Sequence, residues 1–101
     1  MSLGRIGPDA APAVRELIPL LGDKNERIGE EAVLALGRIG ASATDPLVAA
    51  CADADVTVRR RAALSLGHLS APDEKAKQAV LKCASDSAPQ VRAAAIKALG
   101  E

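Results

Sequence analysis

The chain has 101 residues, of which 49% are hydrophobic, and it contains no Phe, Tyr or Trp. Its 13 basic and 13 acidic residues cancel, which excludes the strong field of a dedicated nucleic-acid binder or of a protein that binds acidic membranes. No apolar run approaches the ~20 residues that a membrane span requires and no signal segment is apparent, so we expect a cytoplasmic protein. A core of Leu, Ile, Val and Ala favours helices packed on helices.

A repeat of 30 to 33 residues is the strongest pattern in the chain. Leu-Gly marks one place in each copy, and Asp, then Ile or Val, then Ala precede the glycine by 14, nine and five residues. A repeat of this length predicts a solenoid, in which each unit packs only against its neighbours. The Leu-Gly pairs are Leu3-Gly4, Leu36-Gly37, Leu66-Gly67 and Leu99-Gly100. The residues that precede them are Asp23, Asp53 and Asp86, then Ile28, Val58 and Val91, then Ala32, Ala62 and Ala95.

These marks divide a single array, residues 1–101, into a tail at 1–7, which looks like the end of a truncated repeat, and units at 8–40, 41–70 and 71–101. Apolar residues at helical spacing predict two antiparallel helices in each unit. In the first helices these residues are Val14, Leu17, Ile18 and Leu21, then Leu47, Val48 and Cys51, then Ala79, Val80 and Cys83. In the second helix of the middle unit they are Val58, Ala62, Leu66 and Leu69, which form one buried stripe. We therefore predict an all-α fold, an α-solenoid of about three stacked helical hairpins.

Prolines and glycines indicate where the helices begin and end. Prolines near the starts of the first helices lose little by lacking an N–H, and one more stands near the start of the last helix. Pro19 lies inside a helix, where we expect a kink. Glycines follow the apolar stripe as C-terminal helix residues do. The prolines near helix starts are Pro8, Pro46, Pro72 and Pro89, and the glycines are Gly7 and Gly40.

The two cysteines, Cys51 and Cys83, are 32 residues apart, which is not the spacing of a zinc site or a redox pair. We interpret them as small buried hydrophobic residues. If they occupy similar places in adjacent repeats, they lie roughly 8 to 10 Å apart, beyond the ~7 Å limit for a disulfide. Both thiols are therefore expected to be reduced.

The order Asp, four residues, Val-Arg, Ala, Leu-Gly resembles the HEAT-like repeats of the phycobilisome-lyase type. The first unit departs from this pattern, because Gly29 stands where the arginine belongs. The resemblance implies a ladder of Asp and Arg between neighbouring repeats, at the turn between the helices. From the residues alone, Asp53 and Asp86 either cap the following helix or accept hydrogen bonds from Arg59 and Arg92.

No set of residues supports catalysis, a cofactor or a metal site. His68 is the only histidine, and we expect it to be a solvated residue at a helix end. Ser65 has no predicted partner that could activate it. The run from Arg59 to Arg61 spans ~200° of a helix, so the three side chains cannot face one phosphate. A charge ladder with a neighbouring helix, which carries Glu30 and Glu31 at the equivalent positions, explains Arg60 and Arg61 at least as well.

The pattern favours a non-catalytic protein–protein interaction scaffold, a fragment of a longer HEAT-repeat protein whose partner is another protein. Nucleic acid is not favoured, and no membrane is involved. The alternative is an accessory subunit, or a part, of a bilin lyase-like or nucleic-acid-acting HEAT-repeat enzyme. Because both ends of the chain fall inside a repeat, we also expect self-association through uncapped ends.

The candidate binding surface is the side of the second helices opposite the buried stripe, formed by residues seven and three before each glycine and one after it. Leu34 and Leu64 lie in the most outward position. They are either apolar anchors of a binding surface or contacts between adjacent repeats. The candidate binding residues, which we call the outward row, are Glu30, Leu34, Arg38, Arg60, Leu64, His68 and Lys97.

Overall fold

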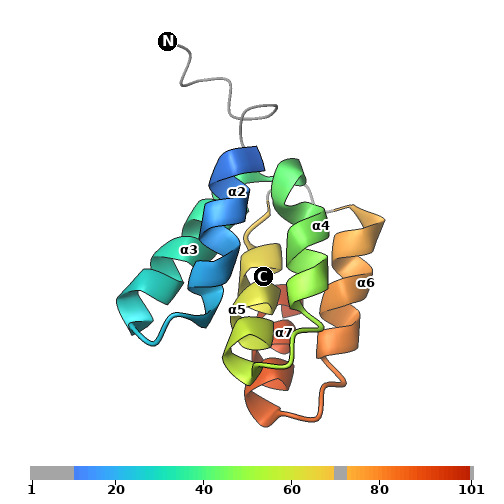
Figure 1. The fold of residues 1–101 in the computed structure, drawn as a ribbon. Helices are drawn as coiled ribbons and strands as arrows, with labels where there is room; N and C mark the ends of the chain where they lie inside the picture. The colour runs from blue at the N-terminus through green and yellow to red at the C-terminus, as the bar shows by residue number, and fades with distance from the viewer. Residues whose placement is uncertain (1–10, 70–72, 101) are drawn as a thin grey trace.

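The computed structural model describes residues 11–69 and 73–100, and every regular element in these two segments is a helix (Figure 1). The all-α prediction is confirmed. The expected features at Gly7, Pro8 and Pro72 lie outside the described residues. Within the described segments, every helix is too short or too polar to cross a membrane. The elements are α2 (Ala11–Leu17), the 3-10 helix η1 (Ile18–Gly22), α3 (Glu26–Ile39), α4 (Ala41–Ala50), α5 (Val56–Gly67), α6 (Glu74–Cys83) and α7 (Pro89–Gly100).

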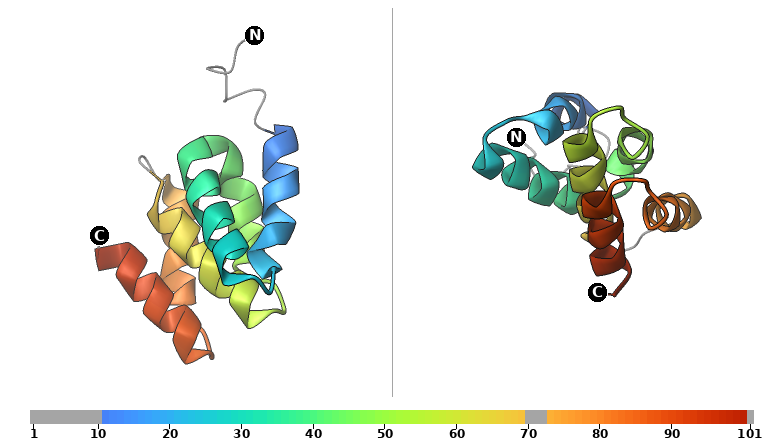
Figure 2. Two further views of the ribbon diagram at one scale, coloured as in Figure 1. Left: turned by 90° about the vertical axis from the view of Figure 1, so that its left-hand side faces the viewer. Right: turned by 90° about the horizontal axis from the view of Figure 1, so that it is seen from below.

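The helices form three hairpins that lie side by side in two layers. The first unit is α2 with η1 and α3, the second is α4 with α5, and the third is α6 with α7. Viewed from below, α2, α4 and α6 follow one side of the array, and α3, α5 and α7 follow the other (Figure 2). Helix α5 packs against both α3 and α7, and α4 packs against both α2 and α6. Neighbouring units therefore bury each other in both layers, as a solenoid requires.

The core is built from leucines and from many alanines. Leu21, Leu36, Leu47 and Leu66 are fully buried, and each such side chain contributes about 1.5–3 kcal/mol relative to exposure. Alanines fill the spaces between them, so the helix backbones approach closely. The predicted stripe of the middle unit is confirmed, because its four residues are buried or partly buried. The same stripe is not fully buried in the other units, because Ile28 (equivalent to Val58) and Leu99 (equivalent to Leu66) are exposed in α3 and α7.

The proline and glycine predictions hold at three positions and fail at one. The α-helix ends at Leu17, and a 3-10 turn containing Pro19 follows it. Pro89 is the first residue of α7, and Gly40 ends α3 with a φ of 84°. Pro46 is not near a helix start but inside α4. The reason is Gly40, which also serves as the N-cap of α4 and lets that helix begin at once.

Candidate functional site

The three repeated aspartates form the same turn in each unit. A carboxylate oxygen of Asp23 accepts a hydrogen bond from the N–H of the residue two positions later, at 2.7 Å. The equivalent bonds of Asp53 and Asp86 measure 2.8 and 2.9 Å. Such a bond closes an Asx turn, which reverses the chain between the two helices of a hairpin. The aspartate recurs at a fixed distance before the second helix of each unit because it forms this turn.

Helices α3 and α5 are capped by other residues, which corrects the capping alternative for Asp53. The Asn25 side chain accepts from the N–H groups of Arg27 and Ile28, at 2.9 and 3.2 Å, and caps α3. Asp55 accepts from the N–H of Thr57 at 2.8 Å and caps α5. Each cap therefore lies two residues after the repeated aspartate, at the end of the Asx turn.

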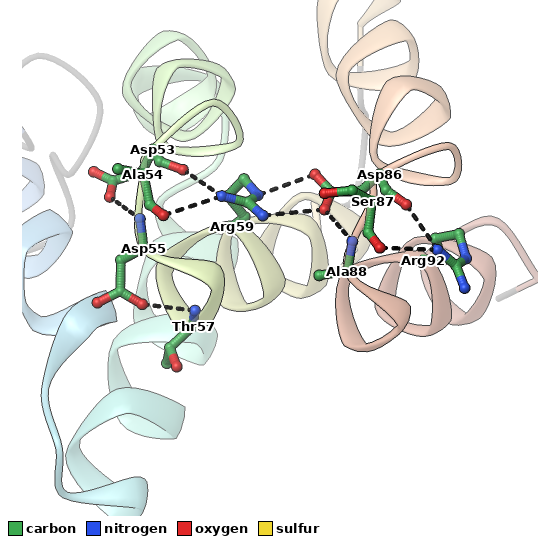
Figure 3. Close-up of polar contacts among 9 residues, drawn as sticks. All are labelled: Asp53, Ala54, Asp55, Thr57, Arg59, Asp86, Ser87, Ala88 and Arg92. Atoms are coloured by element: carbon green, nitrogen blue, oxygen red, sulfur yellow. Dashed lines mark hydrogen bonds and ion pairs between the residues drawn. The ribbon is translucent and has the colours of Figure 1, made fainter.

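Arg59 links the turn of the second unit to that of the third (Figure 3). Its Nε and Nη2 donate to the two carboxylate oxygens of Asp86, at 3.0 and 3.1 Å. Its Nη1 donates to the carbonyl oxygens of Asp53 and Ala54, at 2.8 and 3.2 Å. The N–H of Ala88, followed by the Arg59 guanidinium, lowers the pKa of Asp86. The ladder between neighbouring repeats is confirmed at this junction.

Arg92 repeats only half of this arrangement. Its Nη1 donates to the carbonyl oxygens of Asp86 and Ser87, at 3.0 and 3.2 Å, as Arg59 does in its own turn (Figure 3). The carboxylate of Asp86 binds Arg59 of the preceding unit rather than Arg92. In the ladder, an arginine therefore holds the carbonyl groups of its own turn and the aspartate of the next.

At the first junction, Arg61 takes over the role of the missing arginine. Its side chain is buried, with 2% of the residue exposed, and Nη1 donates to the carbonyl oxygens of Leu21 and Asp23, both at 2.8 Å. Nη2 lies 3.4 Å from a carboxylate oxygen of Glu26. A side chain at Gly29 would collide with this guanidinium, since an added Cβ would lie 2.7 Å from Nε. The glycine that breaks the sequence pattern thus makes room for Arg61.

The three arginines of α5 contact both neighbouring units. Arg59 reaches the third unit, Arg61 is buried against the first, and Arg60 lies 3.7 Å from Glu26 of α3. The expected charge ladder with a neighbouring helix is confirmed for Arg60 and Arg61. Their partner is Glu26, and not Glu30 or Glu31. Arg60 and Arg61 thus share one carboxylate of the first unit, whereas Arg59 binds the third unit.

Small residues bring the second helices into close contact. A Cβ at Gly37 would lie 2.6 Å from the Cβ of His68, and one at Gly67 would lie 2.6 Å from the Cβ of Ala98. Ser65 is fully buried and donates a hydrogen bond to the carbonyl oxygen of Val33 at 2.9 Å. Sequence reasoning missed this role of Ser65. Its signal was a hydroxyl two residues before the glycine, on the side of the helix that meets its neighbour.

The residues of the outward row are more exposed than the stripe that they oppose. Leu34 is 45% exposed, and His68 is an exposed residue at the C-terminal end of α5, as expected. Leu64 is only partly buried and packs against the core, and Arg60 is partly buried by its contact with Glu26. The row is therefore polar at its edges and apolar at Leu34, while Leu64 packs partly against the core. Its exposed members are Glu30, Leu34, Arg38, His68 and Lys97.

The two cysteines line one groove at the junction of the second and third units. Cys51 follows the last residue of α4, and Cys83 is the last residue of α6. They are not equivalent in the repeat, because Cys51 lies two residues before its aspartate and Cys83 lies three before its own. Both are free thiols.

In the described segments, no three His, Cys, Asp or Glu side chains lie close enough together to hold a metal ion. Comparison with curated proteins finds no match for this chain. A family model described as HEAT repeats matches residues 1–67 and again residues 44–101, which together cover the sequence. Hairpins of antiparallel helices with an Asp–Arg ladder between them agree with that match. The chain belongs to the HEAT-repeat family.

Proposed function

We propose that the chain is a non-catalytic scaffold that binds another protein through the outward row. The observation that carries this proposal is Leu34, a large apolar side chain that is 45% exposed on α3. Exposed Glu30 and Arg38 lie one turn before and one turn after it on the same helix. An apolar anchor with a charged rim is the usual composition of a protein-binding surface.

The other polar groups of the repeats support this choice, because they are already used within the fold. The repeated aspartates, Arg59 and Arg61 hold the turns together, and Ser65 joins two helices. Gly37 and Gly67 face neighbouring helices. The exposed members of the outward row, from Glu30 to Lys97, are the positions that these contacts leave for a ligand. The row also lies on the layer of α3, α5 and α7, where successive units can present side chains to one extended partner.

A displayed peptide library tests the proposal and requires no candidate partner. Peptides selected on the immobilised wild-type chain are tested for binding to Leu34→Ser, with Leu81→Ser as the matched control. Leu81 is also exposed, at 55%, but lies on α6 in the other layer. We expect bound peptides to lose at least about tenfold in affinity with Leu34→Ser and to keep it with Leu81→Ser. Peptides that bind all three proteins equally would contradict the proposed surface.

We also propose that a second copy of the chain binds the exposed end of α7. Ile96 and Leu99 are 63% and 48% exposed, whereas the equivalent residues of α5, Ala63 and Leu66, are buried. Helix α5 is followed by a unit that packs against it, while among the described residues nothing packs beyond α7. Another hairpin of the same kind fits such a surface.

The narrower resemblance to phycobilisome-lyase repeats stays a hypothesis about the parent process. It predicts that mixing the chain with a free bilin changes the visible absorbance of the pigment. The scaffold proposal predicts no such change.

A further inference from the structure

Arg92 on α7 uses only part of its guanidinium group within the chain. Its Nη1 donates to the carbonyl oxygens of its own turn, as the Nη1 of Arg59 does one unit earlier. In Arg59 the other edge of the group, Nε and Nη2, binds the carboxylate of Asp86 in the next unit. The same edge of Arg92 has no hydrogen-bond or ion-pair partner among the described residues. A carboxylate at the corresponding place of a further unit would complete the pair.

The exposed side of α7 repeats the side of α5 that contacts the third unit. On α5, Arg59 binds Asp86, and a Cβ at Gly67 would lie 2.6 Å from that of Ala98. On α7, the residues at the equivalent repeat positions are all exposed. They are Arg92 for Arg59, Ile96 for Ala63 and Gly100 for Gly67. Within the described part of the chain, α7 therefore presents one half of a junction between units.

The first unit carries two carboxylates at the positions that would face Arg92 in such a junction. Helix α5 lies between α3 and α7, so the first and third units flank the second (Figure 2). Asp23 is the equivalent of Asp86, and its carboxylate forms no ion pair among the described residues. Glu31 is exposed and is the equivalent of Arg61, which lies against the arginine position of the preceding unit. Stacking a first unit on α7 would thus place both carboxylates beside the unused edge of Arg92.

The same stacking brings small residues together further along the helices. Ala35 is the equivalent of Ala98, so it would lie against Gly100 as Ala98 lies against Gly67. Ile96, which is 63% exposed, would be covered between the charged and the small contacts. Charge, size and apolar surface therefore agree on one register, with α3 of one copy packed on α7 of another.

We propose that copies of the chain join head to tail, with Arg92 of one copy bound to Asp23 and Glu31 of the next. This inference rests on the proposal that a second copy covers the end of α7, and it adds which side of that copy docks and in which register. The contact joins two different surfaces, so each added copy leaves another α7 to be covered and the array can grow. A symmetric pairing of two α7 helices would instead leave Glu31 outside the contact.

Sedimentation velocity of charge-reversed chains tests this register. Glu31→Arg and Arg92→Glu should each raise the concentration needed for association at least about tenfold, because like charges then meet at the junction. An equimolar mixture of the two variants should associate near the wild-type concentration. The reason is that the unchanged α3 of the Arg92→Glu chain can pack on the unchanged α7 of the Glu31→Arg chain. Circular dichroism shows whether each variant keeps its helices.

Glu30→Arg is the matched control, because it reverses an exposed charge one residue before Glu31. Its repeat position is that of Arg60, whose partner is Glu26. On α7 the equivalent of Glu26 is Pro89, which carries no charge. The Glu30→Arg chain should therefore associate like the wild type.

The outcomes separate this inference from the proposal on which it rests. If the wild type stays monomeric, both fail. If the wild type associates and Glu31→Arg associates equally well, or no better than Glu30→Arg, the head-to-tail register is wrong although a second copy still covers α7. A mixture that stays dissociated would also overturn the register. Because Arg92 holds its own turn, Glu31→Arg decides the question if Arg92→Glu loses its helices.

Discussion

The guanidinium group of Arg61 lies against Gly29, in space that any other side chain at position 29 would need. At the next junction, the equivalent positions hold Arg59 in place of the glycine and Ala94 in place of Arg61. Each junction therefore has one arginine and one small residue, with the arginine supplied from opposite sides. In both cases a guanidinium group binds the carbonyl oxygens of a turn.

Exchanging the pair should convert the first junction into the second type. We expect Gly29→Arg alone to lower the free energy of unfolding by about 1–3 kcal/mol through overpacking. Arg61→Ala should lower it by about 1.5–3 kcal/mol, because buried carbonyl groups lose a charged donor. In the double variant the new arginine can reach the carbonyl groups of the turn. The loss in free energy of unfolding of the double variant should therefore be smaller than the sum of the two single losses by at least about 1 kcal/mol. Urea denaturation measures all four proteins, and additive losses would contradict the exchange.

The close approach of the second helices predicts a cost for a single methyl group. Gly67→Ala gains about 1 kcal/mol of helix propensity but places its Cβ 2.6 Å from the Cβ and 3.0 Å from the Cα of Ala98. We expect a net loss of about 1–2 kcal/mol, measured as a lower melting temperature. Gly100→Ala is the matched control, because nothing lies within 4 Å of its added Cβ. A Gly67→Ala protein as stable as that control would show that α5 and α7 can separate without loss.

The fold and the ladder could be predicted because they depend on residues that recur in phase. Asp53, Arg59 and Leu66 each have a counterpart in another unit, so one pattern predicts turn, ladder and core together. Such a pattern cannot predict that a residue in one unit replaces a side chain that is missing from another unit. Gly29 looked like a defect in the first unit, and its meaning became visible only when Arg61, 32 residues later, was found in the space.

The repeat also does not place the two cysteines equivalently. Cys51 and Cys83 differ by one position relative to their aspartates, and a shift of one residue along a helix turns a side chain by about 100°. The exposure of Leu34 and Leu64 also depends on how adjacent units pack, and the repeat pattern left both alternatives open for these residues.

The lowered pKa of Asp86 predicts a pH dependence of stability. A carboxyl group with a depressed pKa stabilises the fold above its unfolded pKa of about 3.9, and this stabilisation is lost as the pH falls through its lower folded pKa. Asp86→Asn should therefore lower the melting temperature at pH 7 and flatten its fall below about pH 4. Asp45→Asn, which removes an exposed ion pair with Lys75, should change the melting temperature at pH 7 little. Parallel acid profiles for wild type and Asp86→Asn would contradict a stabilising role for this carboxylate.

The two leucines of the outward row should differ in their effect on stability. Leu34 is 45% exposed, so Leu34→Ser should change the free energy of unfolding by no more than about 0.5 kcal/mol. Leu64 packs against the core from the same repeat position, and Leu64→Ser should cost about 1–3 kcal/mol. Thermal or urea denaturation distinguishes the two. A large loss from Leu34→Ser would mean that this side chain supports the fold, and the charged residues of the row would then be the remaining candidates for binding.

The exposed end of α7 predicts self-association that depends on concentration. The residues equivalent to Ile96 and Leu99 are buried in both preceding units. They are Val33 and Leu36 in α3, and Ala63 and Leu66 in α5. Covering Ile96 and Leu99 removes apolar surface from water at about 25 cal/mol per Å², so the weight-average mass in sedimentation velocity should rise with protein concentration. A chain carrying Ile96→Lys and Leu99→Lys should stay monomeric over the same range, because two charges cannot be buried without partners. Leu81→Lys adds a charge on another exposed apolar residue and should associate like the wild type. If the wild type is monomeric at every concentration, a second copy does not cover α7. If Leu81→Lys abolishes association as well, the contact lies elsewhere or reflects net charge alone.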